Sequence, residues 1–366
     1  MSTKINVPFF SDEFVNSSQE LLKEISEVLD SRNLILGQKV TEFEQNFAQF
    51  LGASHCITVA NGTDALEIAL RALKIGRGDK VATVANAGFY TSTAVHQIGA
   101  ETIFIEIEPD SFLISIEDLT KKIEQEKISA IVVTHLYGLP ANVEEIVKLA
   151  KARNIYVVED CAQAHGLKIN NKFAGSFGDI STFSFYPTKN LGAIGDGGAL
   201  VTSNSDLAAI VKSIRQYGWG EKYDVKTPFG RNSRLDEIQA AVLNKKLESL
   251  QKNNELRKLA ANRYMSNLAN LPIKFSNQLQ NGVAHLMPIV VETREMLMNY
   301  LLDSRVQTAI HYPIPDHKQS AYQYEIKLPV TEEFCKTVMS LPIFPGISNA
   351  QIDYVSEKIK DFYESR

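Results

Sequence analysis

A lysine in an unusual setting is the first residue of this sequence that could do chemistry. Lys189 follows the β-rich run 179–187 and is surrounded by small and hydroxylated residues in STFSFYPTKNLG. Solvated surface lysines usually lie among other polar side chains on helices. A lysine amine becomes a nucleophile when burial lowers its pKa. Lys189 is therefore a candidate for covalent catalysis.

An acid and an amide at the end of an apolar run form a second candidate. Asp160 ends the run VVED, and Gln163 follows three residues later. Taken alone, an acid in this position is more often only a loop cap. Asp160 could instead pair with a protonated pyridine nitrogen and keep it charged inside a dry site. Such a charged ring withdraws electrons from a carbanion, as in pyridoxal phosphate chemistry, and Gln163 could donate a hydrogen bond to the ring hydroxyl.

A third stretch could bind a phosphate group. Gly62 and Thr63 lie at a strand-to-helix turn, where glycine permits tight geometry and a helix start presents unpaired N–H groups. Taken alone, this stretch is more often an ordinary helix N-cap by Thr63 or Asp64. Ser184, five residues before Lys189, could reach the same phosphate.

A fourth stretch is the glycine-led turn GRNSRLDEIQ at residues 230–239, with Asn232 and Arg234 just before a long helical pattern. Solvated arginines in a helix-capping turn are an alternative explanation. The glycines at 192–198 do not form the G-x-G-x-x-G pattern between a strand and a helix, so a dinucleotide site is poorly supported.

An α/β sheet is needed to bring these stretches together. Between residues 55 and 202, short Val/Ile/Thr/Phe runs alternate with helical patterns, which predicts a mainly parallel sheet covered by helices. The expected strands lie within residues 55–61, 80–86, 101–108, 128–138, 154–160, 179–187 and 197–202. We expect each of the four stretches to lie at the carboxyl end of a predicted strand, where open α/β sheets place their ligands.

The pattern changes beyond Arg234. Residues 235–268 contain no Gly or Pro and predict one long helix or a helix pair. Residues 283–292 and 306–312 are further strand candidates, and 293–304 is helical in pattern. We therefore expect a large domain over residues 1–245 and a small C-terminal α+β domain over residues 246–366.

The composition restricts the class of protein. The chain has 366 residues, 44% of them hydrophobic, and a net charge of −5, which argues against a nucleic-acid surface. No apolar run approaches the roughly 20 residues that span a bilayer, and no signal peptide is evident, so a cytoplasmic location is expected. Cys56, Cys161 and Cys335 are too scattered for a disulfide framework or a metal site.

The motifs together resemble the DegT/DnrJ/EryC1/StrS family of sugar aminotransferases. The resemblance runs from about residue 18 to residue 322 and rests on NGTDAL, EDCAQAHG, SFGDISTFSFYPTKNLGAIGDGGALVT, RQYGWGEKY and GRNSRLDEIQAAVL. It implies the aspartate-aminotransferase fold, fold type I of the pyridoxal-phosphate enzymes. It also implies a homodimer with two shared active sites, and pyridoxal 5'-phosphate as a cofactor that passes through its pyridoxamine form.

The resemblance also implies roles for individual residues. Lys189 would form the Schiff base with the cofactor, Asp160 would pair with the pyridine nitrogen, and Gln163 would contact the ring hydroxyl. Further expected contacts are Gly62, Thr63 and Ser184 to the phosphate, Asn232 to the phosphate from the neighbouring subunit, Phe89 (with Tyr90 second) stacked on the ring, and Tyr312 and His317 to the substrate. For the last two, a Pro-rich surface loop is an equal alternative.

The implied activity is transfer of an amino group from glutamate to a nucleotide-linked keto-sugar, for deoxyamino-sugar biosynthesis. Overall resemblance favours a dTDP-linked 3-keto-6-deoxyhexose, with a 4-keto sugar next. The related dehydratases lack the Schiff-base lysine, and a non-catalytic regulatory protein on the same fold could dispense with it, so Lys189 argues against both. The aminated carbon, the sugar configuration and the nucleotide stay open.

Overall fold

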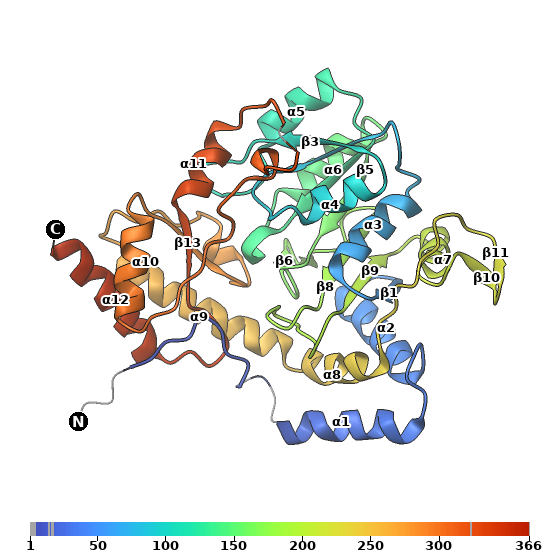
Figure 1. Ribbon diagram of the computed structural model, residues 1–366, viewed down its shortest axis with the longest axis horizontal. Helices are drawn as coiled ribbons and strands as arrows, with labels where there is room; N and C mark the ends of the chain where they lie inside the picture. The colour runs from blue at the N-terminus through green and yellow to red at the C-terminus, as the bar shows by residue number, and fades with distance from the viewer. Residues whose placement is uncertain (1–4, 14, 16–17, 323, 366) are drawn as a thin grey trace.

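A seven-stranded sheet forms the centre of the molecule (Figure 1). The computed structural model describes residues 5–13, 15, 18–322 and 324–365. In sheet order the strands are β1 (His55–Val59), β9 (Gly198–Thr202), β8 (Ile180–Ser184), β5 (Tyr156–Asp160), β4 (Ala130–Thr134), β2 (Lys80–Val84) and β3 (Glu101–Ile105). Within this sheet only β9 runs antiparallel to its neighbours. All seven strands predicted from the sequence are confirmed.

Helices cover both faces of the sheet, which explains why its strands are apolar along their whole length. Along β4, Ala130 and Val132 face one apolar cluster, whereas Ile131 and Val133 face another. The first cluster includes residues of α3 (Gly62–Ala72), α4 (Tyr90–Gln97) and α7 (Ser205–Ile214). Helices on the opposite side are α2 (Gln38–Leu51), α5 (Ile116–Gln125), α6 (Val143–Lys151) and α8 (Glu237–Leu247).

The C-terminal part is built on a second, two-stranded sheet. β12 (Met287–Val290) pairs antiparallel with β13 (Val338–Leu341). The helices of this part are α9 (Leu250–Leu268), α10 (Arg294–Asp303), α11 (Pro329–Thr337) and α12 (Asn349–Glu364). The pattern over 235–268 forms a helix pair, and α9 carries the chain from α8 to the C-terminal helices (Figure 1).

One strand prediction is wrong. Residues 306–312 form only isolated bridges, from Val306 to Val7 and from Ala309 to Ser340. Pro313 and Pro315 follow and cannot donate to a ladder, and the backbone N–H of Asp316 already donates to Ala85 O at 2.7 Å. The segment therefore leaves the small sheet and crosses to the large one.

The remaining regular elements are short or peripheral. They are α1 (Ser18–Ser31), the hairpins β6 (Lys168–Ile169) with β7 (Lys172–Phe173) and β10 (Trp219–Glu221) with β11 (Asp224–Val225), and the 3-10 turns η1 (Leu136–Gly138), η2 (Leu279–Asn281) and η3 (Asp316–Lys318). Across the described residues, no helix combines the length and apolarity required to cross a membrane.

The large and small parts share one apolar cluster. It includes Val133 of the large sheet, Tyr264 of α9 and Met339 of the small sheet. The division at residue 245 stays a prediction. The mixed, mainly parallel sheet with helices on both faces confirms the fold class expected for a fold type I enzyme.

Candidate active site

A cavity of about 590 Å³ opens at the carboxyl ends of the central strands. Six of the residues first chosen from the sequence as cofactor contacts line it together: Gly62, Thr63, Asp160, Gln163, Ser184 and Lys189. They come from the starts or ends of α3, β5 and β8 and from the loop after β8, which are distant in the chain but adjacent in the fold. The remaining lining residues are Asn61, Leu66, Ala87, Tyr90, Thr134, Leu136, Ala162, Tyr186 and Asp196.

The start of α3 forms one end of this cavity. The helix is capped by Asn61, whose side chain accepts the Asp64 N–H at 2.8 Å, and neither Thr63 nor Asp64 is the cap residue. Among the described residues, the N–H groups of Gly62 and Thr63 have no protein acceptor. A Cβ on Gly62 would lie 2.7 Å from Ser184 Cβ, so only glycine allows α3 to approach β8 this closely. Free N–H groups beside two hydroxyls suit a phosphate.

Lys189 is half-buried, and its surroundings favour the neutral amine. Burial lowers its pKa to about 8, although the nearby Asp160 carboxylate acts in the opposite direction. The next residue, Asn190, is buried and fixed by hydrogen bonds to Asn254 at 2.8 Å and to His285 at 3.0 Å. These hydrogen bonds, one of them to a residue of α9, fix the backbone next to Lys189.

Asp160 is a buried carboxylate that forms no ion pair with any residue that the structure describes. Its side chain is only 6% exposed and accepts the Ala162 N–H at 3.0 Å. Burial raises its pKa, although that hydrogen bond and the charge of Lys189 lower it. A buried carboxylate is most stable beside a positive partner, and a protonated ring nitrogen is one.

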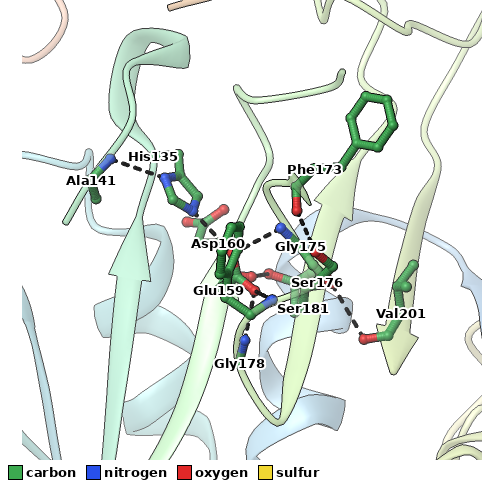
Figure 2. Close-up of polar contacts among 12 residues, drawn as sticks. His135, Ala141, Glu159, Asp160, Phe173, Gly175, Ser176, Gly178, Ser181 and Val201 are labelled. Carbon is green, nitrogen blue, oxygen red and sulfur yellow. Dashed lines mark hydrogen bonds and ion pairs between the residues drawn. The ribbon is translucent and has the colours of Figure 1, made fainter. Parts of the chain in front are cut away.

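The preceding residue, Glu159, is fixed by a separate network on the other side of β5 (Figure 2). Its carboxylate accepts hydrogen bonds from His135 Nε2 at 3.2 Å and from the N–H groups of Gly175, Phe177 and Gly178 at 2.7–2.8 Å. Burial alone would raise the pKa of Glu159, but these donors hold it below its ordinary value. The network ties the loop before β8 to the end of β5.

Three groups that could ligate a metal meet at this network. Ligand atoms of His135, Glu159 and Cys161 lie within 4.8 Å of one another. His135 Nδ1 accepts the Ala141 N–H at 3.2 Å, so its Nε2 carries the proton that Glu159 accepts. Burial also raises the pKa of the Cys161 thiol, which disfavours the thiolate. The cluster is explained by its own hydrogen bonds.

The amide of Gln163 is oriented by its protein neighbours. Its Oε1 accepts the backbone N–H of Tyr137 at 2.6 Å, which obliges the amide nitrogen to point the other way. That nitrogen donates to Tyr312 Oη at 3.2 Å and retains a second hydrogen. Tyr137 has a left-handed backbone, with φ of 63°, and its hydroxyl donates to His311 O. One buried tyrosine thus positions both Gln163 and the residue before Tyr312.

The structure favours Tyr90 over Phe89 as the aromatic wall. Tyr90 lines the cavity and meets Tyr312 edge to face at 6.1 Å between ring centroids. Phe89 is outside the lining and packs against Tyr322 at 4.9 Å and His96 at 5.6 Å. The order of preference drawn from the sequence therefore reverses, because Phe89 is the N-cap of α4 and its side chain turns toward that helix.

Two further predicted site residues lie elsewhere. His317 is fully buried within η3, with its Nε2 3.0 Å from a Glu332 oxygen, and does not line the cavity. Asn232 is exposed and also lies outside the lining of its own chain's cavity. Its backbone pairs with Gln216, at the base of the segment that carries the β10–β11 hairpin.

Some residues in and beside the cavity were not predicted from the sequence. Thr134 ends β4, and the strand-end rule that selected Asp160 could have found it. Tyr186 lies between Ser184 and Lys189, in a motif already identified. Tyr137 acts through its backbone N–H, for which the sequence has no signal.

Comparison with known proteins identifies the family. The model of the DegT/DnrJ/EryC1/StrS aminotransferase family matches residues 16–360. The chain belongs to this family. The aminotransferase fits pyridoxal 5'-phosphate through its half-buried lysine, its buried carboxylate and the free N–H groups at α3, and family membership confirms this cofactor.

Relatives and a solved structure match the aminotransferase over nearly its whole length. A dTDP-3-amino-3,6-dideoxy-alpha-D-galactopyranose transaminase of Aneurinibacillus thermoaerophilus is 40% identical, covering 97% of this chain and 99% of the relative. A dTDP-3-amino-3,4,6-trideoxy-alpha-D-glucose transaminase of Micromonospora megalomicea subsp. nigra is 36% identical, covering 95% and 96%. The crystal structure of S. venezuelae DesV in complex with a ketimine intermediate superposes with a TM-score of 0.94 at 36% identity, covering 98% and 99%.

Proposed function

We propose that this aminotransferase moves an amino group from glutamate to the keto carbon of a nucleotide-linked sugar, in the first place a dTDP-linked 3-keto-6-deoxyhexose. The observation that carries the proposal is the single cavity in which the Lys189 amine, the Asp160 carboxylate and the α3 phosphate site meet. The two relatives described above are both named for dTDP-3-amino sugars, which favours the 3-keto substrate. A 4-keto sugar is the alternative.

Three residues of the cavity would each have a separate role toward the cofactor. Lys189 would hold the cofactor covalently and, once freed, move a proton between the donor α-carbon and the cofactor carbon. When bound, pyridoxal phosphate supplies an electron sink for the negative charge at that α-carbon. Asp160 would keep the ring nitrogen protonated, and the free hydrogen of Gln163 would bind the ring hydroxyl.

The cofactor's phosphate and ring faces would be held by separate elements. Gly62, Thr63 and Ser184 would bind the phosphate at the start of α3. We propose that the Tyr90 ring, rather than that of Phe89, stacks on the cofactor, because Tyr90 lines the cavity. Tyr312, bound to Gln163 and packed against Tyr90, is the better supported of the two proposed substrate contacts.

A homodimer would complete the site. Asn232 directly follows a segment with large exposed apolar side chains, including Tyr223 at 77% and Phe229 at 69% exposure. Exposed apolar groups gathered on one segment indicate a surface that a partner covers. We propose that a second copy covers it and that Asn232 reaches the phosphate of the partner's site.

A half-reaction screen tests the proposed function. Protein loaded with pyridoxamine 5'-phosphate would be mixed with 3-keto and 4-keto nucleotide sugars, and the return of the pyridoxal absorbance would be followed. We expect fastest conversion with dTDP-linked 3-keto sugars. Conversion only with 4-keto sugars would select the alternative. Conversion with none of these sugars would refute a sugar substrate, provided that glutamate still converts the pyridoxal form of the same protein to the pyridoxamine form. Lys189→Ala serves as the inactive control.

A further inference from the structure

Asp316 is a buried carboxylate for which the proposed function gives no role. It begins η3, is 1% exposed and lies outside the cavity lining. It belongs to the Pro-rich segment 311–322, which also carries Tyr312. Burial raises its pKa to about 7, although the bonds it accepts from Ser92 and Phe89 lower it. A buried carboxylate costs free energy unless hydrogen bonds from the protein replace those it made to water.

Three hydrogen bonds of Asp316 cross to residues 85–92, which run from the end of β2 into the first turn of α4. One carboxylate oxygen accepts the Phe89 N–H at 2.9 Å, and the other accepts the buried Ser92 hydroxyl at 2.6 Å. The backbone N–H of Asp316 donates to Ala85 O at 2.7 Å. Three hydrogen bonds therefore join two segments that are more than 220 residues apart in the chain.

Asp316 also supplies a cap that α4 lacks. The N-cap residue of α4 is Phe89, which has φ of 68° and whose side chain makes no capping hydrogen bond. A carboxylate at a helix N-terminus satisfies free N–H groups and interacts favourably with the helix dipole. The start of α4 therefore depends on a residue of the 311–322 segment.

One joined segment carries Tyr90, which lines the cavity, and the other carries Tyr312, which packs against Tyr90 and accepts a hydrogen bond from Gln163. Tyr90 directly follows Phe89, and Tyr312 lies four residues before Asp316. The contact between them leaves little free space, because a Cβ on Gly88 would lie 2.9 Å from two atoms of the Tyr312 ring. A small shift of either segment would change where Tyr90 and the Tyr312 hydroxyl stand.

We infer that Asp316 is a positioning residue. It fixes the position of Tyr90 relative to Tyr312 and so shapes the part of the cavity that receives the keto-sugar. The assignment of that part to the sugar rests on the proposed function. The linkage of the two segments rests on the hydrogen bonds alone.

Three variants separate this role from general stabilisation. Asp316→Ala removes both acceptors. Asp316→Asn keeps one acceptor for the Phe89 N–H, and its amide can donate to Ser92 Oγ, so it should largely rescue the contact. Glu106→Ala is the matched control, because Glu106 binds the N–H groups of Val330 and Thr331 at the start of α11 and does not line the cavity.

Hydrogen exchange of the cofactor-free protein is the first measurement. Asp316→Ala should speed exchange in residues 85–92 and 311–322 together, whereas Glu106→Ala should act only around α11. Exchange that rises in one segment without the other would overturn the linkage. If Asp316→Ala does not fold, Ser92→Ala removes one of the same bonds and should show a smaller change in both segments.

Steady-state kinetics are the second measurement. We expect Asp316→Ala to raise KM for the keto-sugar about tenfold and to change kcat less than about threefold, with Asp316→Asn close to wild type. An unchanged KM, or the same increase in Glu106→Ala, would refute the positioning role. If wild-type protein aminates no sugar, the proposed function fails, while hydrogen exchange still decides whether Asp316 links the segments.

Discussion

At the scale of single residues, burial sets the state of the two groups that would do the chemistry. The Lys189 amine is shifted toward its neutral form, and the Asp160 carboxylate is shifted toward its protonated form. A neutral amine can attack a carbonyl carbon, and a buried carboxylate gains most from a cationic partner. Both shifts therefore prepare the cavity for a cofactor with an aldehyde and a ring nitrogen.

The pKa of Lys189 predicts how capture of the cofactor depends on pH. The deprotonated amine reacts, so the rate at which cofactor-free protein gains the visible absorbance of lysine-bound pyridoxal phosphate should rise with pH, with a midpoint at about 8. Stopped-flow absorbance over a pH series measures this rate. N-acetyl-lysine is the control, and a protein midpoint near the ordinary lysine value of 10.5 would contradict the prediction.

Asp160→Asn should retain the cofactor but lose most of the activity. The amide has a similar shape, but it cannot hold a proton on the ring nitrogen, so the electron sink weakens. Loss of one preorganised electrostatic group typically reduces kcat by about 100-fold or more. Single-turnover conversion by glutamate measures the effect. An unchanged rate would make Asp160 a strand-end cap and nothing else.

At the scale of elements, the strand ends are fixed by polar networks as well as by apolar packing. The Glu159 carboxylate accepts hydrogen bonds from one imidazole and three backbone N–H groups, and these bonds join β5 to the loop before β8. Asn190 similarly joins the Lys189 loop to α9 through Asn254. Each network holds the element that carries a proposed catalytic group, although its own members do not line the cavity.

Glu159→Gln should destabilise the protein strongly. The amide nitrogen would face N–H donors, leaving buried groups unpaired at a cost of about 3 kcal/mol. The free energy of unfolding, from a denaturant titration, checks this value. Glu144→Gln is the control, because Glu144 only accepts a bond from Asn170 at the surface. Equal stability of the two variants would show that the network contributes little.

At the scale of the whole molecule, one residue that was assigned to the cofactor phosphate, Asn232, lies away from the cavity of its own chain. Asn232 is exposed and lies beyond its own cavity, at the base of a segment rich in exposed aromatic groups. In a two-fold dimer the contacts are reciprocal, so if this segment of one copy reaches the cavity of the other, the second copy's segment reaches the first cavity. The proposed shared site follows from this arrangement.

Mixing two inactive variants tests the shared site. Asn232→Ala and Lys189→Ala should each be nearly inactive, but mixed dimers would contain one site with both defects and one with neither. After full exchange of an equimolar mixture about half the dimers are mixed, so roughly a quarter of all sites should recover activity. Subunit exchange is confirmed separately, for example with tagged chains. If Asn232 served its own chain, no activity would return.

The sequence by itself determined the large sheet and the main chemistry of the cavity. Apolar runs marked all seven strands, because strands buried on both faces leave an unbroken signal. The motifs around Asp160 and Lys189 determined the family, since the types and order of those residues are specific. Gly62, Thr63, Gln163 and Ser184, which line the cavity, were predicted because they lie next to strand ends.

Only the tertiary structure decided which residues of the aromatic and Pro-rich segments meet the cavity. The choice between Phe89 and Tyr90 depends on where α4 begins, and the N–H of its N-cap residue, Phe89, donates to a carboxylate 227 residues away. His317 and Tyr312 share one segment, yet one is buried against Glu332 and the other contacts Gln163. Long-range hydrogen bonds decide these orientations, and they leave no periodic pattern in the sequence.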